Sequence, residues 1–491
     1  MGWIEKNAVR CLLGSLVCWS VGCTAAQPED GPAADATEPP DTAEMLRDAG
    51  ADTSQPRPDT SRQSPDTGDD AGAGSDAVAD TNTYRAVAED YDGPGDFVVH
   101  GWGTLTAVAG SDGSFMRGLH HGAPQLPSFV HRLGYRGVSE ERLSAGEAYL
   151  PGPVSLSAGS GVMHFFSKGS RNVELRLRMP SGWPTAWFPR PEAMRPQFPP
   201  DCKCSERQLR QAGLDELADG ELSWSFELDY QSRRLLDLPA SSPWQAAREV
   251  PSAGFVVSEA EADRFLYHAG LATDSLPMSV TTRQKTATFE VTIENDAEYA
   301  FGDIYLFDVH ETQGRYLYGT GSKELAAGGS RTFSPAPKES PIPKDLLASR
   351  AKNDLTRSLR EMGLRDREAA AAADAWLEPI FRESGYRLLV LLPNAWAAEN
   401  FPVDISPTPD ELKRVFAARV EILKPAQEAA ARDRILRAHS NGESLVDVVG
   451  EGRFREALFR RGCRMVTDQK ISRWCEGELR EVGAQRFSGD E

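Results

Sequence analysis

The segment Leu222-Ser-Trp-Ser-Phe-Glu-Leu-Asp-Tyr230 alternates large apolar side chains with polar ones. Because successive side chains of a strand point to opposite faces, this pattern predicts a β-strand with one buried face. Residues 172–179 and 287–293 repeat the alternation, and the apolar run 162–166 is typical of a fully buried strand. Short strands separated by turns predict an antiparallel sandwich.

From Lys344 onwards the apolar spacing changes to that of helices. One expected helical face carries Leu347, Ala351, Leu355, Leu359 and Met362, and a second carries Ala369, Ala373, Trp376, Leu377, Ile380 and Phe381. The fold class expected is therefore mainly β with α: a sandwich-like antiparallel β region followed by a helical C-terminal part.

Three local patterns carry further expectations. Thr408-Pro-Asp-Glu411 has the form of a capping box, so a helix is expected to start there. Trp183, Trp187 and Phe188 are spaced by prolines, which predicts an irregular aromatic loop. Residues 426–485 are expected to form helices that are interrupted at Asn441-Gly442, Gly450 and Arg461-Gly462.

The charge of the chain is concentrated near its N-terminus. The 491 residues carry a net charge of −19, and residues 27–83 alone hold fourteen acidic side chains against three arginines. This segment has few apolar residues, so it is expected to be a disordered linker. The rest is only mildly acidic, which argues against a nucleic-acid partner. The chain has no run of eighteen apolar residues, so no transmembrane helix is expected.

The first residues resemble an export signal. A positively charged start precedes the short apolar segment 11–22, which ends in Ser20-Val-Gly-Cys23. This end resembles the lipobox of bacterial lipoproteins, although Ser20 stands where that family prefers a large aliphatic residue. The resemblance implies that Cys23 becomes the acylated N-terminus, with palmitate-type chains anchoring the protein to a membrane. Thr24 after the cysteine then favours the outer membrane. The alternative is cleavage after Ala26, which would release a secreted soluble protein.

These features predict five parts of the chain. Residues 1–22 form a signal peptide, and 23–92 hold the lipid anchor site and the disordered acidic linker. Residues 93–340 form a β-rich region, 341–425 an α/β region that completes the folded core, and 426–491 a helical C-terminal extension.

Motifs in the folded part are similar to those of a group of uncharacterised exported bacterial proteins. That group opens with His-Glu-Trp-Gly-Thr-Phe-Thr, and this chain has His100-Gly-Trp-Gly-Thr-Leu-Thr106, followed by Gly110-Ser-Asp-Gly113 and Leu126-Pro-Ser-Phe-Val130. The resemblance covers about 96–425. It implies a layout and no activity, and Gly101 stands where the group has Glu.

Four sets of side chains are candidates for chemistry. The first is the histidines His100, His120, His121, His131 and His164, which lack the spacing of a metal motif, so no metal site is predicted. The second is Glu227 with Asp229, two carboxylates expected on one strand face, which suit either glycoside hydrolysis or a solvated surface. The third is the tryptophans Trp102, Trp183, Trp187, Trp224 and Trp244, which suit either a ligand platform or a core.

The fourth set is the cysteines of the folded part, Cys202, Cys204, Cys463 and Cys475. In an exported chain they are candidates for structural disulfides. In one straight helix Cys463 and Cys475 would lie about 18 Å apart, too far to bond. A bridge between them therefore requires a turn, for which Thr467-Asp468 is the candidate. The alternatives pair each of them with Cys202 or Cys204.

These patterns identify no catalytic residue and no cofactor. The function they favour is that of an envelope-anchored lipoprotein with a binding or structural role, whose partner is the membrane and an envelope glycan or protein. The alternative is a hydrolase that acts on envelope or extracellular polymers and uses carboxylate or histidine groups.

Overall fold

The computed structural model describes residues 83–85, 91, 93, 95–117, 126–135, 154–198, 203–238, 242–285, 289–318, 324–334, 340–382, 384–449 and 454–488. All of them belong to one compact unit that begins at Ala77. The expected signal peptide, Cys23 and nearly all of the expected linker lie outside the described residues.

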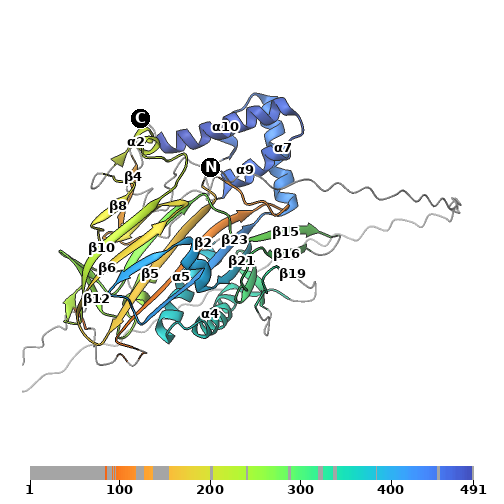
Figure 1. Cartoon of the computed structure of the whole chain (residues 1–491). Helices are drawn as coiled ribbons and strands as arrows, with labels where there is room; N and C mark the ends of the chain where they lie inside the picture. The colour runs from red at the N-terminus through yellow and green to blue at the C-terminus, as the bar shows by residue number, and fades with distance from the viewer. Residues whose placement is uncertain are drawn as a thin grey trace, which may run out of the picture. The chain divides into compact units, whose positions relative to one another are not determined.

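A sheet of ten strands forms the centre of this unit (Figure 1). Its order is β20 (Ile342–Pro343), β18 (Gln313–Tyr318), β17 (Ile304–Val309), β21 (Gly385–Leu392), β23 (Glu411–Ile422), β2 (Phe97–Ala109), β5 (Leu156–Ser167), β14 (Leu266–Ala272), β7 (Gly182–Phe188) and β3 (His131–Arg132). Neighbouring strands run antiparallel except β2 and β23, which pair in parallel with Gly101 opposite Arg414. The motif that begins at His100 therefore lies in a central strand.

Smaller sheets cover one face of the large sheet. The first contains β13 (Glu261–Asp263), β12 (Phe255–Ser258), β10 (Gly220–Asp229), β6 (Arg171–Met179) and β22 (Val403–Ser406), with β8 (Ala193–Arg195) also paired to β10. The second contains β15 (Met278–Gln284), β16 (Phe289–Asn295) and β19 (Ser330–Phe333). Their inward side chains, such as Leu175, Trp224 and Val291, share one core with the large sheet. This is the sandwich that the alternating pattern predicts. Two short pairs, β1 (Thr83–Tyr84) with β11 (Arg233–Arg234) and β4 (Gly134–Tyr135) with β9 (Lys203–Cys204), complete the strands.

Helices cover the other face of the large sheet. Residues of α3 (Pro243–Arg248), α4 (Lys344–Glu361) and α5 (Asp366–Arg382) form a second core with the outward side chains of β2, β14, β17, β21 and β23. Figure 1 shows α4 and α5 lying next to these strands. The expected helical faces are confirmed, because Leu347, Leu355 and Trp376 are among their buried residues. Two short helices, α2 (Glu206–Gln211) and α6 (Asn394–Asn400), lie within loops.

The C-terminal helices pack into a cluster of their own. These are α7 (Pro425–Asn441), α8 (Leu445–Val449), α9 (Arg455–Arg464) and α10 (Gln469–Ser488). They join the sandwich at the turn after β2, where the buried Glu428 carboxylate accepts hydrogen bonds of 2.6 Å from the Ser111 amide and hydroxyl. Arg461 of α9 contacts both Glu428 (3.2 Å) and Asp112 (2.8 Å). The Gly110–Gly113 turn is thus an attachment point for α7 and α9.

The expected fold class is confirmed: the protein is mainly β with α, and its helices dominate the C-terminal part. None of the helices in the described part of the chain combines the length and apolar character that crossing a membrane requires.

The helix expected at 408–411 is wrong, because β23 begins at Glu411. The Asp410 carboxylate still accepts hydrogen bonds from backbone amides, but from those of Asp96 (2.7 Å) and Phe97 (3.0 Å) at the start of β2. The same capping chemistry therefore ties two strands together instead of starting a helix.

Two further expectations are corrected. Residues 182–188 form the fully buried strand β7 instead of a loop, and Pro184 is tolerated because the pairing with β14 shifts register beside it. The helix break expected at Arg461-Gly462 is also absent, since α9 runs through both residues. A Cβ atom at Gly462 would lie 2.8 Å from Ile435 Cδ1, so glycine allows α9 to approach α7 closely.

Candidate functional site

The structure brings two of the candidate histidines together around a glutamate. His100 of β2 and His164 of β5 stand opposite each other on paired strands, and both side chains face α5. Glu368 Oε2 lies 2.8 Å from His100 Nδ1, and Glu368 Oε1 lies 3.4 Å from His164 Nδ1. His164 Nε2 in turn lies 2.9 Å from the Ala247 carbonyl oxygen, to which it donates.

Glu368 is fully buried and ionised in this setting. Burial alone would raise its pKa, but the hydrogen bond from His100 and the nearby His164 imidazole hold the pKa well below its usual range. Its carboxylate also accepts a bond of 3.0 Å from the Arg365 amide at the start of α5. Arg365 places its guanidinium over Phe166 and Tyr91, next to the histidines. The histidine–glutamate unit is therefore interior, and it ties α5 to the centre of the sheet.

The other candidate histidines do not join this unit. His131 bonds to Glu261 in a half-buried pair, and His120 and His121 lie outside the described residues. Within the described part of the chain, no cluster of three or more potential ligand side chains is arranged to hold a metal ion.

The surroundings of Glu227 and Asp229 differ. Glu227 is exposed, whereas Asp229 is buried at the end of β10. Asp229 accepts hydrogen bonds from the Arg233 guanidinium (2.6 Å) and from the Tyr230 and Gln231 amides. Burial opposes ionisation of Asp229, but these donors lower its pKa. The residue therefore fixes the turn after β10.

The five candidate tryptophans are all buried, so they form no exposed platform. Trp102 packs against His164 and Trp376, and the indole of Trp224 donates to the Pro189 carbonyl oxygen (2.8 Å). Trp183 likewise donates to the Ala218 carbonyl oxygen. These side chains contribute apolar area and fixed hydrogen bonds to the cores.

One of the possible cysteine pairings is now established. Cys463 of α9 and Cys475 of α10 are bonded, with their Cα atoms 5.9 Å apart. The chain turns between Arg464 and Gln469, and this turn includes Thr467-Asp468, as expected. Cys204 is also disulfide-bonded, and Cys202 lies outside the described residues.

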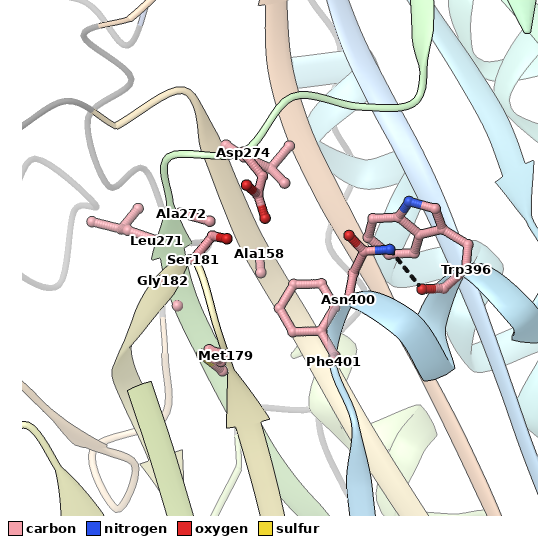
Figure 2. Close-up of a pocket in the computed structure, with 12 residues that line it drawn as sticks. Ala158, Met179, Ser181, Gly182, Leu271, Ala272, Asp274, Trp396, Asn400 and Phe401 are labelled. Atoms are coloured by element: carbon pink, nitrogen blue, oxygen red, sulfur yellow. Dashed lines mark hydrogen bonds between the residues drawn. The ribbon is translucent and has the colours of Figure 1, made fainter. Parts of the chain in front are cut away.

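A cleft opens at the end of the sandwich (Figure 2). It is shallow: most of its roughly 330 Å³ of empty space is open solvent, and the enclosed part has room for about one water molecule. Figure 2 shows Trp396, Asn400 and Phe401 on one side and strand residues such as Ala158 and Leu271 on the other. The lining is mainly apolar, and Ser181, Asp274 and Asn400 are its polar side chains. None of the histidine–glutamate residues lines this cleft.

A buried cation lies next to the cleft. Arg414 of β23 is 4% exposed, and its guanidinium donates through Nη1 to the carbonyl oxygen of Phe401, which lines the cleft. Its buried Nε atom has no hydrogen-bond partner among the described residues. Nearby, His268 of β14 is 5% exposed, and the described part of the chain offers no partner to its Nδ1 atom either. Buried polar atoms without a hydrogen-bond partner are uncommon in folded proteins and call for an explanation.

Sequence reasoning missed Glu368, Arg414 and His268, and it did not predict the cleft. Glu368 lies three residues into a helix whose neighbours are mostly alanines, and its partners are far away in the chain. Arg414 gave no clear signal either, because Lys413 precedes it in β23 and the charged residues Arg419 and Glu421 follow it.

Comparison with known proteins identifies no family for this chain. No protein-family model matches it, and no curated protein sequence does either. Among solved structures, it is similar to the yeast delta-COP-I mu-homology domain complexed with a Dsl1 WxWxV peptide, at 8% identity over 67% of this chain and 98% of that one, with a TM-score of 0.24. The same yeast domain without the peptide is 9% identical over 68% of this chain and 100% of its own chain, with a TM-score of 0.24. Red sea bream transglutaminase is 11% identical over 62% of this chain and 32% of its own chain, with a TM-score of 0.12. TM-scores this low carry no argument about fold or function.

Proposed function

We propose that this chain is an envelope-anchored lipoprotein whose folded unit binds a ligand in the cleft between α6 and the ends of β5 and β14. The observation that carries the binding role is the cleft itself, a mainly apolar opening with a few polar side chains, as is usual for ligand sites. The lipobox-like segment ending at Cys23 supports the anchor. The acidic linker would then hold the cleft away from the membrane surface.

The anchor is tested by replacing Cys23 with Ala in the full chain. We expect the variant to lose incorporation of labelled palmitate and to move from the membrane fraction to the soluble fraction. A variant that stayed in the membrane fraction would show that Cys23 is not the anchor.

The binding role is tested by photo-crosslinking in cells. A benzophenone amino acid at Ser181, on the wall of the cleft, should give adducts with envelope components. The control places the same group at Ser349, which is exposed on α4. If the two positions gave the same adducts, the cleft would not be the binding site.

A hydrolase of envelope polymers is the second candidate. The observation in its favour is the 2.8 Å contact between His100 Nδ1 and Glu368, which resembles the orienting pair of a general base. Against it, both residues are buried and neither lines the cleft. This candidate predicts that purified protein releases soluble fragments from labelled envelope polymers and that His100→Asn abolishes the release.

A further inference from the structure

His164 faces a hydrogen-bond acceptor with each of its two ring nitrogens. Its Nε2 atom lies 2.9 Å from the Ala247 carbonyl oxygen of α3, and its Nδ1 atom lies 3.4 Å from Glu368 Oε1 of α5. The side chains of His164 and Glu368 are both fully buried. Apart from their mutual contact, Nδ1 of His164 and Oε1 of Glu368 have no hydrogen-bond partner among the described residues. The imidazole therefore links two helices that cover the same face of the large sheet.

The number of protons on the ring decides how many of these acceptors it can satisfy. A carbonyl oxygen can only accept, so the 2.9 Å contact with Ala247 places a proton on Nε2. If the imidazole were neutral, the lone pair of Nδ1 would point at the ionised carboxylate of Glu368. Two buried acceptors that face each other both stay unsatisfied, which is costly in a protein interior. A second proton, on Nδ1, removes this conflict because it turns the contact into a charge-assisted hydrogen bond.

The charges around His164 are compatible with this second proton. The Glu368 carboxylate contacts the imidazole, and His100 needs only one proton, on Nδ1, to serve the other carboxylate oxygen. The other charged side chains around the unit come from α5, from β23 and from the neighbourhood of α3: Arg365, the Glu411–Lys413 pair and the Arg248–Asp263 pair. Each pair combines opposite charges. Arg365 opposes the second proton, but its guanidinium lies over the Phe166 ring, whereas the carboxylate contacts the imidazole itself. A protonated His164 and an ionised Glu368 then balance each other's charge.

We propose that His164 carries protons on both ring nitrogens in the folded protein, and that losing one of them at higher pH loosens α3. After this loss, the remaining proton can serve either the Glu368 carboxylate or the Ala247 carbonyl oxygen. The bond to the carboxylate is the stronger of the two, so the proton stays on Nδ1 and the Nε2 proton leaves to water. The Nε2 lone pair then faces the Ala247 carbonyl oxygen, and α3 loses its hydrogen bond to β5. The bond is therefore complete where His164 is fully protonated and is lost as the pH rises.

The protonation state is tested by long-range proton–nitrogen NMR of the purified full chain with labelled histidine, which reports on each ring nitrogen. At about pH 7, where an ordinary histidine is mostly neutral, we expect both nitrogens of His164 to carry protons. The signals are assigned with Trp102→Phe, which keeps an aromatic ring near His164 and should shift its resonances. Glu368→Gln removes the anionic acceptor, so His164 should carry one proton in that variant at the same pH. One unprotonated His164 nitrogen in the unaltered chain at about pH 7 would overturn the proposal.

The loosening of α3 is tested by hydrogen–deuterium exchange of residues 243–250, corrected for the intrinsic effect of pH on exchange. Between about pH 6 and about pH 9 the opening of α3 should increase at least about tenfold, as expected for losing a hydrogen bond that involves a charged group. His164→Gln should abolish this response, because a glutamine side chain does not titrate. His439→Gln is the control and should keep the response, since His439 lies beside Trp474 in the cluster of C-terminal helices. A response that is absent from the unaltered chain, or that survives in His164→Gln, would overturn the proposed release.

Discussion

Replacing Glu368 with Gln should destabilise the folded unit by about 3 kcal/mol. Glu368 is fully buried and accepts hydrogen bonds from His100 Nδ1 (2.8 Å) and the Arg365 amide (3.0 Å). Removing one partner of a buried pair typically costs about 3–5 kcal/mol. Glutamine keeps the size of the side chain and one acceptor oxygen, which places the expected loss at the lower end of that range.

The measurement is urea-induced unfolding followed by tryptophan fluorescence, to which Trp102 contributes beside His164 and Trp376 beside Trp102. Glu378→Gln is the matched control on the same helix. The Glu378 side chain is 45% exposed and pairs with Arg382, so its loss should change the free energy of unfolding by about 0.5 kcal/mol or less. If the two variants had the same stability, the histidine–glutamate unit would not stabilise the fold.

The same residue makes stability depend on pH in a defined direction. The pKa of Glu368 is lowered in the folded state from its ordinary value of 4.5. A lowered pKa contributes stability that is complete above the unfolded value and is lost as the pH falls towards the folded one. Below about pH 4.5 the unaltered protein should therefore lose stability more steeply than Glu368→Gln. Parallel profiles for the two proteins would contradict this assignment.

Two further predictions concern the C-terminal helices. Replacing Cys463 and Cys475 together with Ala opens a loop with a sequence separation of 12 and should cost about 3 kcal/mol, seen as a lower melting temperature without reductant. Because the Cys204 bridge remains, reductant should still act on the variant, but by less than on the unaltered protein. An unchanged melting temperature would count against a stabilising bridge. Gly462→Ala should cost about 1–3 kcal/mol in chemical unfolding, because its Cβ atom would press on Ile435. Gly477→Ala, in α10 with no atom within 4 Å of the added Cβ, should be neutral or stabilising by comparison, and equal effects of the two alanines would refute the close-contact argument.

The regular elements were predictable wherever burial repeats with a fixed period. The alternation at 222–230 predicts β10, and the apolar spacing from Leu347 to Leu359 predicts α4. In each element one face is buried in the core and the other faces solvent, so the apolar residues recur with a fixed period. Such patterns report which side of an element is buried. They do not report which element covers it, and so the parallel pairing of β2 with β23 was not predictable.

The wrong predictions arise where the same local sequence pattern is compatible with two different structures. An aspartate that binds backbone amides is typical of a helix start, yet Asp410 binds the amides at the start of β2. Proline indicates a loop, yet Pro184 fits a strand where the register shifts. Glycine indicates a helix break, yet Gly462 lies inside a helix that needs a close approach. Contacts made by distant parts of the chain decide each case.

The candidate site was predictable only in part. His100 and His164 belong to strands that the sequence does predict, but Glu368 reaches His100 across 268 positions. Local patterns cannot reveal such a contact. Arg414 is harder still to recognise from the sequence, because what distinguishes it is a buried Nε atom without a hydrogen-bond partner among the described residues. That absence can be recognised only after its surroundings are known.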